Sequence, residues 1–238
     1  MQTINRQEFK YFIKKDDVPS MRSFLGNALI PDIFSEDGSY QISSLYFDTL
    51  YDDDFNQKLD GIMYREKYRI RIYDNDIATA KFEVKRKLNN CIQKLSSKIS
   101  ESDLFDIYQG NYSVLEKYKG LEYVPARLEY LGYSPINIVT YNREAYTLPI
   151  NNIRVTIDSD LRTHGFQTDL VNLTESPMIH VQKSGLDILE IKFENHIPNY
   201  IVDFLSTFAS VRSSVSKYAL SRVHSNTEIN GDEPLIAF

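Results

Sequence analysis

One short stretch constrains the fold of this chain more than any other. In YREKYRIRIYD, residues 64–74, the odd positions carry Arg65, Lys67, Arg69 and Arg71, and the even positions are mostly aromatic or aliphatic. Successive side chains of a β-strand point to opposite faces of the sheet, so this alternation predicts a strand with a purely cationic face. Four positive charges about 7 Å apart along one face require surroundings that compensate for their repulsion.

Other segments repeat the alternation with carboxylates among the cations. KFEVKRK at 81–87, IRVTID at 153–158 and LEIKFE at 189–194 each place charged residues on one side of a strand and apolar residues on the other. The charged sides either face solvent around a sandwich core or line the inside of a barrel whose apolar sides are covered by helices. Same-signed, Arg-rich faces favour the barrel, since like charges on neighbouring strands repel.

The order of expected elements predicts an α+β fold in which one closed or nearly closed antiparallel sheet is surrounded by helices. The expected strands are 4–13, 40–47, 64–73, 79–87, 125–133, 137–146, 152–158 and 187–194. The expected helices are 17–29, 49–60, 101–109, 198–209 and 213–222. No linker divides the chain, so we expect one domain over residues 1–223 and a polar C-terminal tail over 224–238.

The charge is unevenly distributed along the chain. The net charge is −6, yet residues 64–94 hold nine Lys or Arg residues and four acidic ones. A basic region in an acidic protein predicts a focused anion site and no nucleic-acid surface. The single cysteine, Cys91, excludes an internal disulfide. Without a long apolar run or a signal-peptide pattern, the sequence predicts a cytoplasmic protein with no transmembrane segment.

The residue types on the charged faces indicate phosphate chemistry. Arg binds phosphate oxygens in a bidentate manner, and Lys adds a compact positive charge. A carboxylate among these cations suits Mg²⁺ or Mn²⁺, which bridges phosphate oxygens. Cations and metal-binding carboxylates together are the parts of a phosphoryl-transfer site, where catalysis rests on positioning and charge neutralisation.

Several motifs, in order along most of the chain, resemble the VTC domain. This is the polyphosphate polymerase domain of the vacuolar transporter chaperone, a branch of the triphosphate tunnel metalloenzyme (CYTH-like) superfamily. Besides the segments quoted above, the resemblance rests on RQEFKYFI at 6–13, SLYFDT at 44–49, YNREAY at 141–146 and SSVSKYAL at 213–220. Tunnel phosphatases usually open with Glu-x-Glu-x-Lys. Here the first acidic position is Arg6, followed by Glu8 and Lys10, which is closer to the VTC branch.

The resemblance implies an eight-stranded antiparallel barrel with a basic lumen, in which Mn²⁺ or Mg²⁺ assists transfer of the ATP γ-phosphate to a growing polyphosphate chain. The implied catalytic residues are Lys10, Arg69, Arg71, Lys81, Arg143, Arg154 and Lys217. The predicted phosphate-binding residues are Lys67 and Lys85, from the alternation of charges, and Lys94 and Lys192, from the resemblance; the implied metal ligands are Glu190 and Glu83. For Lys94, Arg143 and Lys217 the resemblance is the only argument.

Two other functions use the same residues. A tripolyphosphatase or nucleoside triphosphatase would transfer the phosphoryl group to water in the same tunnel. A non-catalytic module would bind polyphosphate without turning it over. Glu190 favours an enzyme, because a pure anion binder has no use for a carboxylate among cations. The expected ligands are therefore ATP or another nucleoside triphosphate, inorganic polyphosphate and tripolyphosphate.

Overall fold

The structure is a computed structural model that describes residues 6–32, 34, 38–88, 91–165, 167–173, 177–181, 185–208, 213 and 215–230. Its centre is one large antiparallel sheet. The order of the strands across the sheet is β1 (Arg6–Lys14), β10 (Leu186–Glu194), β8 (Ile153–Thr163), β7 (Ser134–Leu148), β3 (Tyr40–Asp48), β4 (Tyr64–Tyr73), β5 (Asp76–Leu88) and β6 (Cys91–Lys98). Two short strands, β2 (Ile30–Pro31) and β9 (Ile179–His180), pair with β7 and β8.

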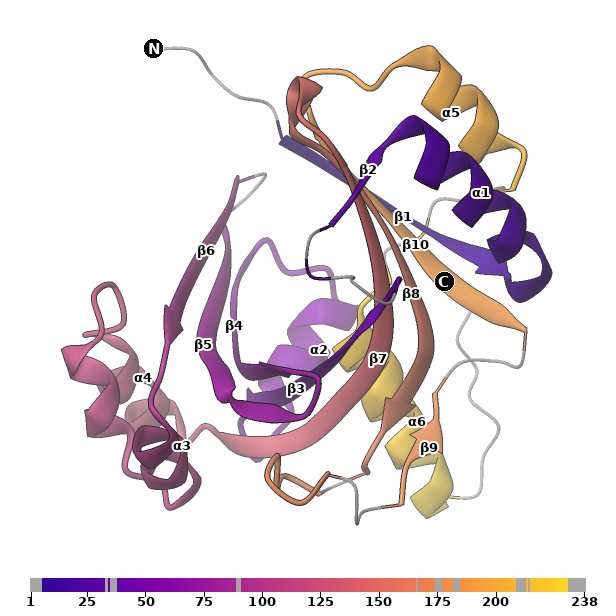
Figure 1. Cartoon of the computed structure of the whole chain (residues 1–238). Coiled ribbons are helices and arrows are strands. Elements are labelled where there is room, and N and C mark those ends of the chain that lie inside the picture. The colour runs from indigo at the N-terminus through magenta and orange to yellow at the C-terminus, as the bar shows by residue number, and fades with distance from the viewer. Residues whose placement is uncertain are drawn as a thin grey trace.

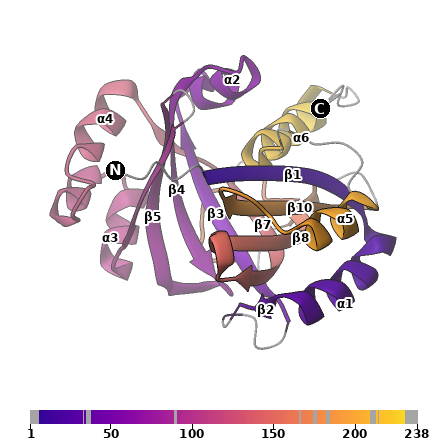
Figure 2. The ribbon, with the colours of Figure 1, turned by 90° about the horizontal axis from the view of Figure 1, so that it is seen from above.

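The sheet is strongly curved, and helices cover its outer side in two groups (Figures 1 and 2). The first group lies over β1, β10 and β8 and consists of α1 (Val18–Ala28) and α5 (Asn199–Ser206). The second lies over β4 and β5 and consists of α3 (Glu101–Tyr108), the 3-10 helix η2 (Tyr112–Lys117) and α4 (Val124–Leu131). The expected α+β class, with a large antiparallel sheet and flanking helices, is confirmed.

Two more helices lie together at the end of the sheet where β4 begins (Figure 2). These are α2 (Asp53–Leu59) and α6 (Lys217–Asn230). Tyr218 of α6 donates a short hydrogen bond to Asp48 at the end of β3, and its ring stacks on Tyr46 with centroids 5.0 Å apart. Two short 3-10 helices, η1 (Lys15–Asp17) and η3 (Ile150–Asn152), complete the elements.

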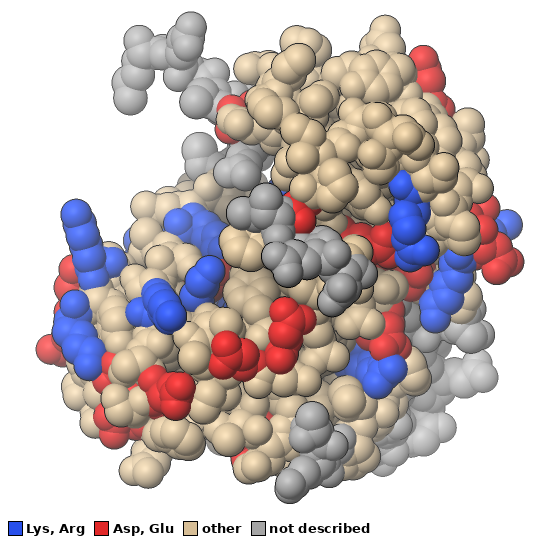
Figure 3. Space-filling model, viewed as in Figure 1, with Lys and Arg blue, Asp and Glu red and all other residues tan. Residues whose placement is uncertain are grey.

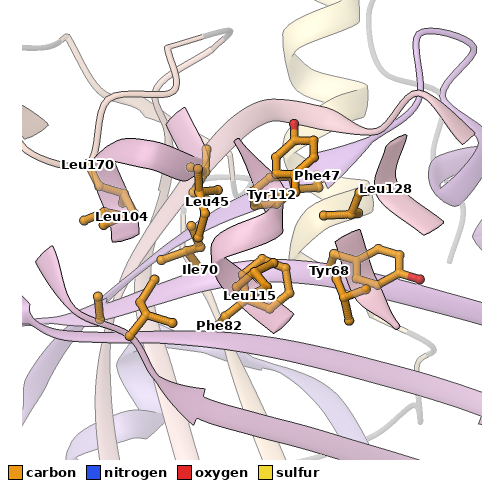
Figure 4. Packing of buried hydrophobic residues seen from close by; sticks show 14 of the residues in the cluster. Leu45, Phe47, Tyr68, Ile70, Phe82, Leu104, Tyr112, Leu115, Leu128 and Leu170 are labelled. Carbon is orange, nitrogen blue, oxygen red and sulfur yellow. The ribbon is translucent and has the colours of Figure 1, made fainter. Parts of the chain in front are cut away.

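The apolar sides of the alternating strands form the outer cores. Ile70, Ile72 and Phe82 are fully buried against Leu104 and Leu115 of the covering helices (Figure 4). On the same outer side, at the other end of the strand order, Leu189 and Ile191 pack in the same way against α1 and α5. The apolar faces therefore point outward to helices, as the barrel interpretation predicted, and the sandwich alternative is wrong.

Three expectations differ from the structure. The expected strand at 125–133 is wrong, because these residues form α4, which begins with Pro125 in its first turn and ends at Gly132 in the left-handed conformation. Strand β6 had not been expected. The last helix is longer than 213–222: α6 continues to Asn230, into the expected tail, and residues 231–238 lie outside the described part of the chain.

The path of strands begins at β1 and ends at β6, and no backbone pairing joins these two strands within the described residues. The eight strands of this path match the expected number, but closure into a barrel stays a prediction. In the described part of the chain, no helix combines the length and the apolar character that crossing a lipid bilayer requires.

Candidate functional site

The charged sides of the strands share the inner face of the curved sheet, which we define as the face opposite the two helix groups. Strand register places the predicted residues on it. On β4 and β5, Arg71 lies opposite Lys81, Arg69 opposite Glu83 and Lys67 opposite Lys85. On β1, β10 and β8, Lys10 lies opposite Glu190, and Lys192 lies opposite Arg154. Residues far apart in the sequence thus lie on one face of the sheet.

Glu83 organises the first half of this surface. Its buried carboxylate accepts hydrogen bonds from Arg69 at 2.7 Å, lies 3.9 Å from Arg71 and contacts Lys94 at 2.5 Å. Burial alone would raise the pKa of Glu83, but these three cations hold it well below its usual range. Glu83 is therefore a permanent anion that fixes three cations in place. The inward position of Lys94, implied only by the resemblance, agrees with this contact.

Glu190 has the same role on the opposite half. Its carboxylate is 2.7 Å from Lys192 and 3.7 Å from Arg143, and Lys10 is its cross-strand neighbour. Burial would raise the pKa of Glu190, yet Lys10, Lys192, Lys217 and Arg143 hold it well below its usual range. Glu83 and Glu190 lie on separate strands, β5 and β10, and no contact joins them in the described residues.

Two carboxylates that the sequence interpretation did not assign complete the arrangement. Asp158 on β8 accepts two hydrogen bonds from Arg143, at 2.6 and 2.7 Å, and pairs with Lys217 of α6 at 2.6 Å. Glu8 on β1 pairs with Lys10 at 2.6 Å and lies 3.7 Å from Lys85 on β5. The contact between Glu8 and Lys85 joins the two halves across the inner face. Both acids stood in the alternating motifs, so the pattern contained the signal.

Lys67 differs from Arg69 and Arg71 on the same strand, because no carboxylate pairs with it among the described residues. Its ammonium nitrogen is buried without a hydrogen-bond partner in the described residues and lies 4.8 Å from the centre of the Tyr218 ring. Burial lowers the pKa of Lys67 to about 8, although the nearby Asp54 opposes the shift. Burial also lowers the pKa of Lys85 to about 8, against the attraction of Glu8. A bound anion would stabilise the charged form that burial disfavours at both sites.

Lys81 and Arg154 are not paired with Glu83 or Glu190 among the described residues. The Lys81 ammonium is 5.2 Å from the centre of the Tyr73 ring. Arg154 donates hydrogen bonds to Asp32 at 2.8 Å and to the Tyr40 hydroxyl at 3.1 Å. The part of Arg154 in a phosphate site remains a prediction.

The structure also separates the roles of Tyr46 and Asp48 in the SLYFDT motif. The Tyr46 hydroxyl accepts a hydrogen bond from Arg69 at 3.2 Å, and Arg69 and Arg71 lower its pKa against the effect of burial. Asp48 is fully buried and accepts hydrogen bonds from the backbone N–H groups of Asp54 and Phe55 at the start of α2. Tyr46 thus belongs to the inner face, and Asp48 anchors a helix.

The carboxylates of Glu8 and Glu190 are the best candidates to hold a metal. They lie on neighbouring strands, β1 and β10, and burial and repulsion by Glu190 raise the pKa of Glu8, although Lys10, Lys85 and Lys192 lower it overall. Oxygen donors suit Mg²⁺ and Mn²⁺. No group of three or more metal-ligating side chains is assembled among the described residues. Glu8, Glu83 and Glu190 are each paired with a lysine, so the metal roles predicted for Glu190 and Glu83 stay predictions.

Figure 3 shows the face of the molecule that is turned to the viewer in Figure 1, and both basic and acidic side chains lie on it. This view contains no continuous basic area of the kind that follows a nucleic-acid backbone. The basic concentration predicted from residues 64–94 is instead directed to the inner face, where carboxylates partly neutralise it. The arrangement suits a small or linear polyanion.

Comparison with known proteins supports these observations. The family model described as the VTC domain matches residues 5–224. The fold is similar to a Pyrococcus horikoshii OT3 protein of 12% identity, with a TM-score of 0.51 that covers 94% of this chain and 99% of that one. It is also similar to a Bacillus halodurans protein provisionally described as an adenylate cyclase, with 16% identity, a TM-score of 0.50 and coverage of 89% and 95%. No curated protein matches at a significant level.

Proposed function

This chain belongs to the VTC domain family, and from this premise we propose that it is a metal-dependent phosphotransferase that uses ATP to extend inorganic polyphosphate on its inner face. The observation that carries the proposal is that each of two buried carboxylates is surrounded by three cations. Around Glu83 these are Arg69, Arg71 and Lys94. Around Glu190 they are Lys10, Lys192 and Arg143. These cations are held in position before any substrate arrives, which is the preorganisation that phosphoryl transfer requires.

Each group has a definite part in this proposal. Arg69 and Arg71 would bind phosphate oxygens on the β4 side, and Lys10 and Lys192 on the β10 side, with the Arg guanidinium groups providing bidentate contacts. Glu190 and Glu8 would hold Mg²⁺ or Mn²⁺. The ion, when bound, supplies positive charge at the phosphate oxygens on which negative charge develops.

The pKa directions favour a phosphate acceptor over water. Cations hold the pKa of Glu83, Glu190 and Asp158 below the usual range despite burial, so these carboxylates are weak bases near neutral pH. Phosphate binding would raise the pKa of Lys67 and Lys85, which then remain protonated. A terminal phosphate oxygen is already an anion and needs no base, whereas water must lose a proton.

Enclosure of the substrate is the finer part of the proposal. The contact between Glu8 of β1 and Lys85 of β5 brings the two halves of the sheet within side-chain reach. This contact supports a tunnel-like site in which a phosphate chain is surrounded by cations. Exclusion of bulk water would strengthen every charge interaction inside and limit hydrolysis.

The test is a product analysis. The purified protein is incubated with ATP and Mn²⁺ or Mg²⁺, with and without a short polyphosphate primer, and the products are separated by size. We expect long polyphosphate as the product, together with one ADP for each phosphoryl group that is transferred. If free phosphate is the main product, the protein is a triphosphatase and not a polymerase. No turnover, with tripolyphosphate still bound, would leave only a polyphosphate-binding module.

A further inference from the structure

The end of the inner face next to α2 carries cations that the proposed reaction centre does not use. Strand register places Arg65 of β4 directly opposite Lys87 of β5, one step beyond the pair of Lys67 and Lys85. On these two strands the inner face holds no carboxylate from this pair to Glu83. Directly opposed like charges destabilise a sheet, so two successive cation pairs indicate an anion that both strands bind.

A third element adds to this concentration of charge. Lys58 of α2 is half-buried, as are Arg65 and Lys87. Burial lowers the pKa of Lys58, and repulsion by Arg65, Lys10 and Lys87 lowers it further. Lys58 therefore lies within electrostatic reach of cations on β1, β4 and β5. We define Lys58, Arg65 and Lys87 as the rim cluster.

Arg65 and Lys87 of the rim cluster differ from the cations of the centre in how their charges are compensated. At the centre, Arg69 and Lys94 contact the Glu83 carboxylate at 2.7 Å or less. Among the described residues, no carboxylate lies within 4 Å of Arg65, Lys67 or Lys87. The Arg65 guanidinium donates a 2.6 Å hydrogen bond to the backbone carbonyl of Ile62. The buried, unpartnered nitrogen of Lys67 lies between the rim cluster and the centre.

These positions form a track. Arg65 and Arg69 are separated by four residues of extended strand, about 13 Å. A single small anion does not reach from one end to the other, but a linear chain of phosphates does. The track runs from Glu83 past Lys67 and Lys85 to the rim cluster beside α2.

We propose that the rim cluster is a chain-length subsite, which binds the phosphates of a long inorganic polyphosphate beyond those held at the centre. This inference rests on the proposed function, since it assumes that the inner face binds phosphate chains. It adds that the protein distinguishes long chains from triphosphates, and that Lys58, Arg65 and Lys87 supply this preference.

The experiment compares two probes, tripolyphosphate and long-chain polyphosphate, by calorimetric titration at one salt concentration. The proteins are the wild type, a triple variant with Lys58→Ala, Arg65→Ala and Lys87→Ala, and Lys119→Ala as a control at an exposed cation outside the inner face. In the triple variant we expect long-chain affinity to fall by about tenfold or more, the scale of losing hydrogen bonds to charged groups. Tripolyphosphate affinity should stay within about twofold, and the control should match the wild type.

The outcomes separate this inference from the function on which it rests. Equal losses for both probes, or no loss for the long chain, would overturn the rim cluster while leaving the centre intact. Failure of the wild type to bind either probe would contradict the proposed function itself. The melting temperature of the triple variant, measured beside that of the wild type, checks that it folds. Lys58→Ala alone, at a half-buried position of α2, provides a second variant with the same expected direction.

Discussion

At the scale of single residues, Glu190 is the most informative position on the inner face. Glu190→Gln preserves the size of the side chain and removes the charge that would hold a metal. We expect metal-dependent turnover to fall by a factor of about 10² or more, the scale of losing one important electrostatic stabiliser. Metal-free binding of tripolyphosphate should stay the same or tighten, since a negative charge has left a cationic surface. Steady-state kinetics and calorimetric titration measure the two effects.

The opposite pattern would assign Glu190 a different role. If turnover survives in Glu190→Gln while tripolyphosphate binding collapses, Glu190 serves to position Lys192 and Arg143, and the metal is held elsewhere. Glu83→Gln is the matched comparison, because Glu83 is equally surrounded by cations on the other half of the sheet. We expect its main effect on binding, through misplacement of Arg69 and Arg71.

Lys67 and Lys85 predict the pH dependence of binding. Each has a pKa lowered by burial to about 8 in the free protein. A bound phosphate favours the charged ammonium, so both pKa values are higher in the complex. Binding then takes up protons above about pH 8, and affinity falls as the pH rises through that range. Titrations of tripolyphosphate between pH 7 and 9 should show this fall.

The ligand itself titrates, so the decisive quantity is the difference between proteins. In Lys67→Met the affinity at pH 7 should be lower, and its decline between pH 7 and 9 should be smaller than in the wild type. Lys119→Met serves as the control. An identical pH profile for Lys67→Met and the wild type would show that Lys67 does not face the bound anion.

At the scale of elements, β4 separates stability from binding through neighbouring residues. Ile70→Ala removes a fully buried side chain from the core under α3 and η2, and should lower the free energy of unfolding by about 2–5 kcal/mol. Arg71→Ala, one residue later on the opposite face, should weaken tripolyphosphate binding by about 1.5–3 kcal/mol. Denaturant titration and calorimetry provide the measurements.

The two variants control each other. Ile70→Ala should keep the wild-type affinity for tripolyphosphate under conditions where it is folded, because its side chain never reaches the inner face. If Ile70→Ala abolished binding and Arg71→Ala left it unchanged, the assignment of the two faces of β4 would be reversed.

Where alternation was strict, the sequence predicted the elements well. The expected strand at 64–73 has the bounds of β4, and the expected strand at 187–194 differs from β10 by one residue. Each alternating strand buries its apolar side under helices, so a change of register would expose a whole core face. Burial of one side of each strand therefore explains both why the alternation exists and why it predicts the strands.

Elsewhere the alternation of charged and apolar residues was too weak to predict the element, and tertiary packing determined it. In VPARLEYL the spacing of Arg127 and Glu129 suggested a strand, but Val124 and Leu128 lie one helical turn apart and are buried together in α4. Arg127 instead contacts Glu66 at 2.9 Å on the outer side of the sheet. Strand β6 was missed because an edge strand needs only one partner, and CIQKLSSK has mainly polar side chains.

The candidate site was predictable residue by residue but not as an arrangement. Alternation placed the β4 and β5 cations on one face, and register then paired them. The halves of the inner face meet through Glu8 and Lys85, residues 77 positions apart in the chain, and no local pattern encodes such a contact. The role of Asp158 likewise depends on Lys217 of α6 reaching β8.

At the scale of the whole molecule, we predict that ligand binding and folding stability are coupled. The inner face concentrates cations from β1, β4, β5, β7, β8 and β10 and from α6, and their mutual repulsion opposes folding in the absence of an anion. A polyanion that binds only the folded state stabilises it by RT ln(1 + [L]/Kd). Because salt screens the repulsion, this stabilisation should be larger at low ionic strength.

If the inner face is a polyphosphate site, tripolyphosphate should stabilise the folded protein. The melting temperature of the wild-type protein with and without millimolar tripolyphosphate tests this most directly. The measurement is made at low and high salt, with sodium sulfate at matched ionic strength as the control. We predict a clear rise with tripolyphosphate, larger at low salt and much larger than with sulfate. A melting temperature that tripolyphosphate leaves unchanged, or raises no more than sulfate does, would contradict the account.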